Sequence, residues 1–228
     1  MVNYYGNHNH KKWKNAKKIE KSDFEKEDYL QKFIYENPES IPLYDIKENI
    51  QLLVLCREFP TNSGPVDALG IDREGSIYLV ETKLYKNPDK RLVVAQVLDY
   101  GASLWKNYNF EDFISQINSF LNKKLNINLN QRIEEFFGLE EEEADVIIES
   151  ISLNLKKGNF KFVVLMDKLH QQLKDLIIYL NQNSEFDIYA VEFDYYKYES
   201  YEIVIPKIYG SEVKKEVGTS VSKKELWN

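Results

Sequence analysis

The stretch PVDALGIDREGSIYLVETKL, residues 65–84, contains two short apolar runs separated by a polar link. Residues 65–72 and 76–84 have the length and the aliphatic, partly β-branched composition of strands. The Arg-Glu-Gly link at residues 73–75 has the residue types of a tight turn, so the whole stretch predicts a β-hairpin. Both faces of the second strand are apolar, which favours a central position in a sheet.

The segments around this hairpin predict one α/β domain, with a mixed central β-sheet flanked by helices. Short apolar runs predict further strands at 50–59, 159–166, 186–196 and 198–209. The helical spacing of apolar residues predicts helices at 22–38, 89–107, 110–125, 140–158 and 167–183. Ser22 has the residue type of an N-cap, and we expect it to begin the first of these helices.

The composition is that of a globular protein with one domain. The chain has 228 residues, of which 43% are hydrophobic and 29% are charged. We expect a basic arm at residues 1–21, the domain at 22–209 and a polar tail at 210–228.

No apolar run reaches the roughly 20 residues of a membrane helix, and the start lacks the apolar stretch of a signal peptide. Cys56 is the single cysteine, which excludes an internal disulfide framework and favours a cytoplasmic setting.

The formal net charge of −7 is unevenly distributed along the chain. Residues 132–149 hold eight acidic residues against one arginine, whereas residues 11–21 hold six lysines against one glutamate. The acidic balance argues against a protein that coats nucleic acid by bulk charge. It leaves room for a local basic approach to nucleic acid, because the acidic segment has the pattern of a solvated helix face.

Three ionisable residues stand at the ends of the two hairpin strands. By the two-residue period of a strand, Asp67 shares a face with apolar residues, and so do Glu81 and Lys83. Buried carboxylates are normally paired, metal-bound or at the rim of a site, because leaving one unpaired costs several kcal/mol. One interpretation is an ion pair at a sheet edge. The other is a site in which Asp67 and Glu81 hold a hard divalent ion and Lys83 assists the hydrolysis of a phosphodiester.

Pro65-Val66-Asp67 followed by Glu81-Thr82-Lys83 resembles the signature of the PD-(D/E)XK nuclease superfamily, which has the restriction endonuclease-like fold. Gln96 and Tyr100 look like the Gln-x-x-x-Tyr motif of RecB-like members, and their spacing puts both on one helix face. The first helix and its close at Pro38 are similar to the opening of RecB-like and NucS-like nucleases. The resemblance is carried by residues 22–108, and it implies a nuclease that uses Mg²⁺ or Mn²⁺ to cut DNA.

The resemblance also implies roles for individual residues. Asp67, Glu81 and a glutamate of the first helix would bind the metal ion, with the carbonyl of Thr82 as a further ligand. Glu27 is the glutamate that lies on the apolar face of that helix, although an acid favoured by the helix dipole would occupy the same place. Lys83 would assist the attacking water, and Gln96 and Tyr100 would support the site or contact the DNA backbone.

Other interpretations remain open beside the nuclease. A nuclease-fold module without catalytic activity could bind nucleic acid or a protein partner through the same residues. The DNA could be single-stranded, duplex or branched, and a duplex cutter would often be a homodimer. Basic residues around the site helix would meet phosphates, namely Lys86, Lys90, Arg91 and Lys106. A group of aromatic residues could stack on bases but is more typical of sheet packing: Tyr189, Phe193, Tyr195, Tyr196, Tyr198 and Tyr201.

Overall fold

The computed structural model describes residues 17–48, 50–87 and 92–210. Within these residues the chain forms one mixed seven-stranded sheet in the order β1-β6-β5-β4-β3-β2, with β7 paired to β6. The strands are β1 (Lys21–Ser22), β2 (Leu53–Phe59), β3 (Val66–Ile71), β4 (Ile77–Lys83), β5 (Phe160–Met166), β6 (Asp187–Tyr198) and β7 (Tyr201–Tyr209). The helices are α1 (Glu27–Glu36), α2 (Val93–Asn107), α3 (Phe110–Leu125), α4 (Leu129–Phe137), α5 (Glu141–Lys157) and α6 (Gln171–Asn183).

The predicted mixed α/β domain is therefore confirmed, including the hairpin and the central place of its second strand. β3 and β4 pair antiparallel, whereas β4 pairs parallel with β5 and β5 pairs parallel with β6. Every residue of β4 before Lys83 is buried. This follows from a strand whose two faces are both apolar and therefore need cover on both sides.

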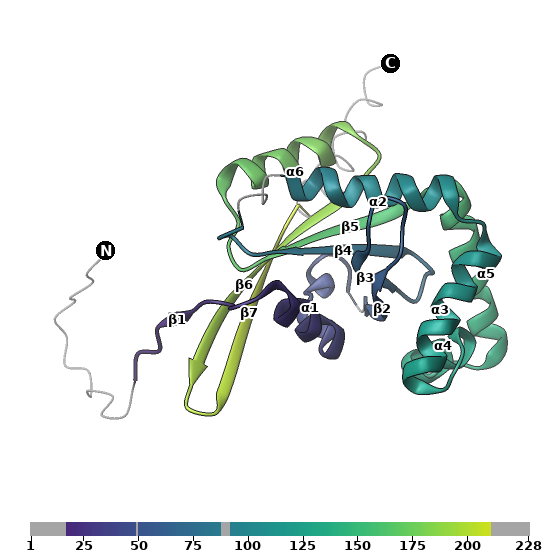
Figure 1. Cartoon of the computed structure of the whole chain (residues 1–228), viewed down its shortest axis with the longest axis horizontal. Helices are drawn as coiled ribbons and strands as arrows, with labels where there is room; N and C mark the ends of the chain where they lie inside the picture. Colours follow the sequence, from purple (N-terminus) through teal and green to yellow (C-terminus); the bar gives the residue numbers. More distant parts are fainter. Residues whose placement is uncertain (1–16, 49, 88–91, 211–228) are drawn as a thin grey trace, which may run out of the picture.

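The sheet separates two hydrophobic cores. One core lies between the sheet and α2 to α6, and the other lies beneath α1 and the short 3-10 helices Pro38–Ser40 and Leu43–Asp45. Figure 1 shows α2 and α6 along one face of the sheet, with α1 on the other face and α3 to α5 gathered at one end. The hairpin of β6 and β7 extends past the body at the opposite end.

The start of the first helix differs from the prediction. Ser22 is not its N-cap but belongs to β1, where it pairs with Tyr195 of β6, and α1 begins only at Glu27. Phe24 explains the delay, because its ring is 1% exposed and stacks on Tyr195 at 4.4 Å between centroids. The chain therefore stays outside the helix until this anchor is buried. Helix α4, which the sequence analysis does not predict, is a short helix of nine residues between two longer ones.

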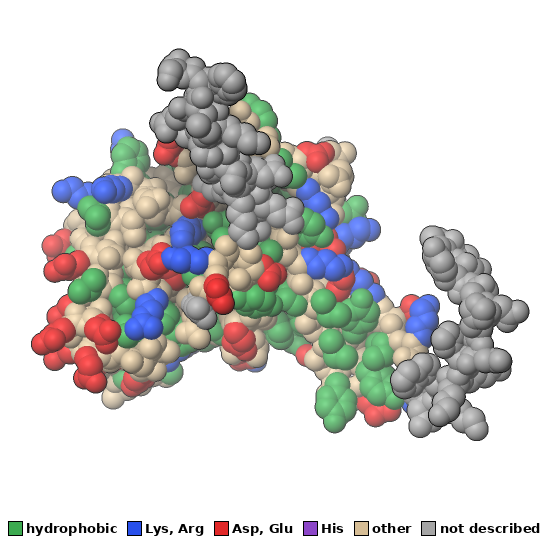
Figure 2. Space-filling model, turned by 180° about the vertical axis from the view of Figure 1, so that it is seen from behind, with side chains coloured by type: hydrophobic (Ala, Val, Ile, Leu, Met, Phe, Trp, Pro, Cys, Tyr) green, Lys and Arg blue, Asp and Glu red, His purple; other side chains and the backbone are tan. Residues whose placement is uncertain are grey.

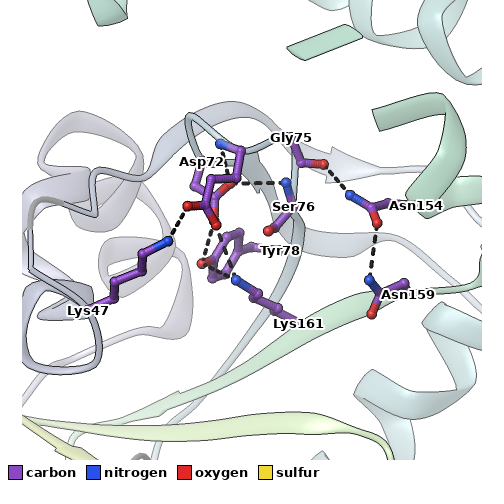
Figure 3. Close-up of polar contacts among 9 residues, drawn as sticks. Lys47, Asp72, Gly75, Ser76, Tyr78, Asn154, Asn159 and Lys161 are labelled. Carbon is purple, nitrogen blue, oxygen red and sulfur yellow. Dashed lines mark hydrogen bonds and ion pairs between the residues drawn. The ribbon is translucent and has the colours of Figure 1, made fainter. Parts of the chain in front are cut away.

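The turn between β3 and β4 is fixed by a buried aspartate (Figure 3). Asp72 is 1% exposed and accepts hydrogen bonds from the backbone N–H groups of Glu74 and Ser76 through Oδ1. Its Oδ2 accepts one from the Tyr78 hydroxyl at 2.9 Å and lies 3.5 Å from the Lys161 ammonium. The network holds the closed end of the hairpin, which leaves the opposite end of the same two strands to carry the ionisable residues.

An acidic cluster and an apolar cluster lie on different parts of the surface (Figure 2). Figure 2 shows acidic side chains gathered over the region of α4 and α5, in agreement with a solvated face at 132–149. Apolar side chains gather over the projecting hairpin, where Tyr201, Ile203 and Ile205 are 67%, 40% and 46% exposed. No helix in the described part of the chain is both long and apolar enough to cross a membrane. Most of the basic arm and nearly all of the polar tail lie outside the described residues.

Candidate functional site

The candidate site lies where β3 and β4 separate. Their ladder runs from Ile71 paired with Ile77 to Ala68 paired with Val80, so Asp67 is the next residue on β3 and Glu81 the next on β4. We call this point the fork. Beyond the ladder, Asp67 Oδ2 accepts hydrogen bonds from the backbone N–H and from the hydroxyl of Thr82, each at 2.7 Å. A side-chain carboxylate thus bonds a backbone N–H just past the end of the ladder.

Glu81 is the most confined acid of the fork. It is 1% exposed, and none of the described residues donates a hydrogen bond to its Oε2 atom. Burial, and then the negative charge of Asp67, raise the pKa of Glu81 to about 9. Burial also raises the pKa of Asp67, although hydrogen bonds from Thr82 and Gln31 act in the opposite direction. Two buried carboxyl groups that share a site disfavour each other's charge, so the fork favours a cation.

Lys83 supplies one cation at the fork. Its ammonium lies 3.7 Å from Glu81 Oε1 and 3.9 Å from Glu27 Oε2, and its side chain is 13% exposed. Glu27 is the first residue of α1, and its Oε1 accepts hydrogen bonds from the Leu84 N–H at 3.1 Å and from Asn87 Nδ2 at 2.9 Å. The structure therefore brings Glu27, Glu81 and Lys83 together. Glu27 also occupies the helix start that the dipole favours for an acid.

The two residues predicted on the second helix contact each other. Gln96 Nε2 donates to the Tyr100 hydroxyl at 2.7 Å, and both residues lie on α2. Burial is the main cause that raises the pKa of Tyr100, and the charges of Glu81 and Asp67 raise it further.

Sequence reasoning missed two residues that contact the site from the other side. Gln31 of α1 donates from Nε2 to Asp67 Oδ1 at 2.7 Å. Arg57 of β2 donates from Nη2 to Gln31 Oε1 at 3.0 Å and to Asp28 Oδ1 at 2.5 Å. A signal was present for both: Gln31 lies one helical turn after Glu27, and Arg57, with Glu58 beside it, interrupts an otherwise apolar strand.

The chemistry of the donor set suits a hard divalent cation. The fork offers two carboxylates, one of which has a buried oxygen that no described residue satisfies, and Mg²⁺ is often bound by one or two carboxylates with waters completing its shell. In the described residues no group of three or more His, Cys, Asp or Glu side chains has an arrangement that could hold a metal ion. Glu27 instead accepts hydrogen bonds from the residues after β4. The residues present therefore fit a site with two protein carboxylates rather than three.

The other residues that the sequence analysis names differ in how far they are exposed and in what they contact. Lys86 donates to the carbonyls of Phe24 and Glu25, while Lys90 and Arg91 lie outside the described residues, and Lys106 is exposed. Cys56 is buried, which raises the pKa of its thiol to about 12. Of the aromatic group on β6 and β7, three members are buried in sheet packing (Tyr189, Phe193 and Tyr195), and Tyr201 is exposed.

Comparisons with known proteins assign no family to the chain. No family model matches it, and neither does any curated protein. A search of solved structures finds the crystal structure of a repair endonuclease from Pyrococcus abyssi, with 15% sequence identity and a TM-score of 0.28. The match covers 73% of this chain and 47% of that one, so the chain spans about half the length of the endonuclease. A likeness this weak supports no argument about activity. A proposal about activity therefore rests on the geometry of the site.

Proposed function

We propose that the protein is a nuclease that hydrolyses DNA phosphodiester bonds with the help of Mg²⁺ or Mn²⁺. The observation that carries the proposal is the fork, where Asp67, Glu81 and Lys83 meet in the interior of a mixed sheet at the carboxyl end of its central strand. Ligand sites of α/β sheets favour this end of the strands. A structural ion pair would not require a second carboxylate beside Glu81, because that carboxylate makes the charge of Glu81 less favourable.

Each residue has a role in this proposal. Asp67 and Glu81 would hold the divalent ion, with the carbonyl of Thr82 as a further ligand and Glu27 next to the ion's shell. When bound, the ion supplies a Lewis acid for the phosphate. Lys83 lies within 4 Å of Glu81 and would stabilise negative charge that develops on the phosphate oxygens. Gln96 would orient the Tyr100 hydroxyl, which can donate a hydrogen bond to a phosphate or to a nearby carboxylate.

One observation favours a second candidate function, a nuclease-fold module that binds nucleic acid or a protein without cutting. Both oxygens of Asp67 already accept hydrogen bonds from the protein. A carboxylate whose oxygens are already hydrogen-bonded could have a purely structural role, which is to close the ladder between the two strands. The two candidates differ in whether the protein cleaves DNA in the presence of a divalent ion.

The test is a cleavage assay with single-stranded, duplex and branched DNA in Mn²⁺, in Mg²⁺ and in EDTA. We expect cleavage of at least one substrate only with a divalent ion, and its loss in Lys83→Met and in Asp67→Asn. Lys32→Met is the matched control, because Lys32 is an exposed residue of α1 that pairs with Glu36. DNA binding by the wild type without cleavage of any substrate would establish the second candidate and reject the nuclease.

A further inference from the structure

Asp67 is held by a chain of hydrogen bonds that begins at the protein surface. Asp28, whose side chain is 77% exposed, accepts from Arg57; Arg57 donates to Gln31; and Gln31 donates to Asp67. We call this series the relay. It joins α1, β2 and β3 from the side of the sheet opposite α2.

Only one orientation of the Gln31 amide fits the relay. An arginine can donate but cannot accept, so the atom of Gln31 that faces Arg57 has to be the carbonyl oxygen. The amide nitrogen of Gln31 then faces Asp67 and donates to Oδ1. Arg57 therefore fixes a donor against Asp67 although it does not touch that carboxylate itself.

Two features indicate that this arrangement is built into the backbone. On β2, Glu58 lies opposite Asp67, between the pairs of Arg57 with Ala68 and Phe59 with Val66. Glu58 has a φ of 53°, a left-handed conformation that a non-glycine residue holds at a cost of about 1–3 kcal/mol. On α1, Glu27 and Gln31 are one turn apart and meet β4 and β3, because one helical turn of about 5.4 Å nearly matches the strand spacing of about 4.8 Å.

We infer that Gln31 and Arg57 are positioning residues that orient the Asp67 carboxylate for a divalent ion, an inference that rests on the proposed metal-dependent function. With Oδ1 held by Gln31 and Oδ2 held by Thr82, the plane of the carboxylate is fixed before any ion arrives. Oδ1 keeps a lone pair for a ligand bond, whereas both lone pairs of Oδ2 are taken by the N–H and the hydroxyl of Thr82. Hydrogen bonds of this kind behind a metal ligand typically contribute 10- to 100-fold in metal affinity.

The experiment measures Mn²⁺ affinity by isothermal titration calorimetry on the full chain, so that it does not depend on activity. We expect Gln31→Met to weaken Mn²⁺ binding by about 10- to 100-fold. Arg57→Met should weaken it in the same direction, and Arg57→Lys, which keeps a donor toward Gln31, should recover most of the affinity. The double variant Gln31→Met/Arg57→Met should be no weaker than Gln31→Met alone, because both substitutions break one path. Lys32→Met on the same helix should leave the affinity unchanged.

Urea unfolding in EDTA shows which variants are folded, and Arg57→Met with its Arg57→Lys partner carries the test if Gln31→Met does not fold. Equal Mn²⁺ affinity in the wild type and in folded Gln31→Met would overturn the positioning role while leaving the metal site intact. Independent, additive losses from Gln31 and Arg57 would overturn the relay. A wild-type protein that binds no Mn²⁺ would reject both this inference and the proposed function.

Discussion

At the scale of single residues, Glu81 is the acid of the fork whose protonation the fold controls most strongly. Its ordinary pKa of 4.5 is raised to about 9 by burial and by the neighbouring Asp67 carboxylate. In the folded, metal-free protein the Glu81 carboxyl therefore keeps a proton that the unfolded chain loses above its ordinary pKa. The folded state binds more protons than the unfolded state across that window, so its stability falls as the pH rises.

This difference gives a testable pH dependence. Without metal, we expect the contribution of Glu81 to the free energy of unfolding to be fully present below pH 4.5 and to be lost toward pH 9, by up to about 1.4 kcal/mol per pH unit. Glu81→Gln cannot ionise and should remove this contribution, so that the variant becomes the more stable protein at neutral pH. Urea titrations in EDTA between pH 5 and pH 9 measure both slopes. Parallel pH profiles for the two proteins would show that Glu81 is not confined as described.

A divalent ion should reverse the order of the same two proteins. Mn²⁺ binds the folded state, and it should raise the melting temperature of the wild type as its concentration increases. Glu81→Gln lacks one of the two carboxylates and should lose that response. Glu36→Gln, an exposed substitution on α1, should keep it. A melting temperature of the wild type that does not change with Mn²⁺ would argue for the ion-pair interpretation of the fork.

At the scale of secondary structure elements, the hairpin of β3 and β4 determines where the fork lies. Gly75 in its turn has a φ of 75°, and a Cβ there would lie 2.5 Å from Ser150 Cβ and 2.8 Å from the Ile147 carbonyl oxygen. Gly138 has a similar φ of 64° but has no atom within 4 Å of such a Cβ. A side chain at either glycine would therefore be held in the same unfavourable left-handed backbone conformation. Only at Gly75 would it also clash with neighbouring atoms.

We expect Gly75→Ala to destabilise the protein by clearly more than Gly138→Ala, which should cost about 1 kcal/mol for its left-handed backbone alone. The excess at Gly75 should be on the order of 1–3 kcal/mol, since α5 packs directly against the turn. Urea unfolding of both variants gives the comparison. Equal losses would mean that the contact between the turn and α5 does not hold the hairpin in place.

The elements that could be predicted from sequence are those with strong local patterns. The alternation around Asp67 and the apolar faces of the Glu81 strand gave the hairpin and the central position, because the period of two is a local property of the chain. The strand at Lys21 could not be predicted, since it exists only through pairing with β6, more than 170 residues away. The sequence marks Gln31 and Arg57 only by helical spacing and by charge in an apolar run, whereas their roles arise from contacts between α1, β2 and β3 that no local pattern records.

At the scale of the whole molecule, the site depends on how α1 is fastened to the sheet. Phe24 stacks on Tyr195 of β6 just before the helix, and Tyr29 and Tyr195 both donate hydrogen bonds to Glu202 of β7. These contacts tie the start of α1 to the projecting hairpin, while Glu27 at that start reaches the end of β4. The first turn of α1 thus links the stacked pair of Phe24 and Tyr195 to the fork.

Removal of the anchor should therefore affect both stability and the site. We expect Phe24→Ala to cost about 3–5 kcal/mol, as for other fully buried aromatic residues, and to weaken Mn²⁺ binding in the molecules that remain folded. Tyr44→Ala, at a ring that is 55% exposed, is the control and should change neither. Urea unfolding and calorimetry give the two quantities. A large loss of stability with full Mn²⁺ affinity would separate the anchor from the fork.

The distribution of charge over the molecule leaves room for the local approach of DNA that the proposed function requires. The acidic side chains lie over α4 and α5, at the end of the molecule away from the projecting hairpin (Figures 1 and 2). The acidic excess behind the net charge of −7 is therefore not spread evenly around the fork. In the proposed function, DNA would approach the carboxyl end of β4, where Lys83 lies.

The proposed cleavage of DNA at the fork with a divalent ion is tested by the rate of cleavage in Mn²⁺ by Glu81→Gln relative to Glu36→Gln. Both variants replace a glutamate by the same amide, but only Glu81 lies at the fork, whereas Glu36 is exposed at the end of α1. We predict metal-dependent cleavage by the wild type and by Glu36→Gln, and none above the EDTA background by folded Glu81→Gln. Equal cleavage by the two variants would contradict the account.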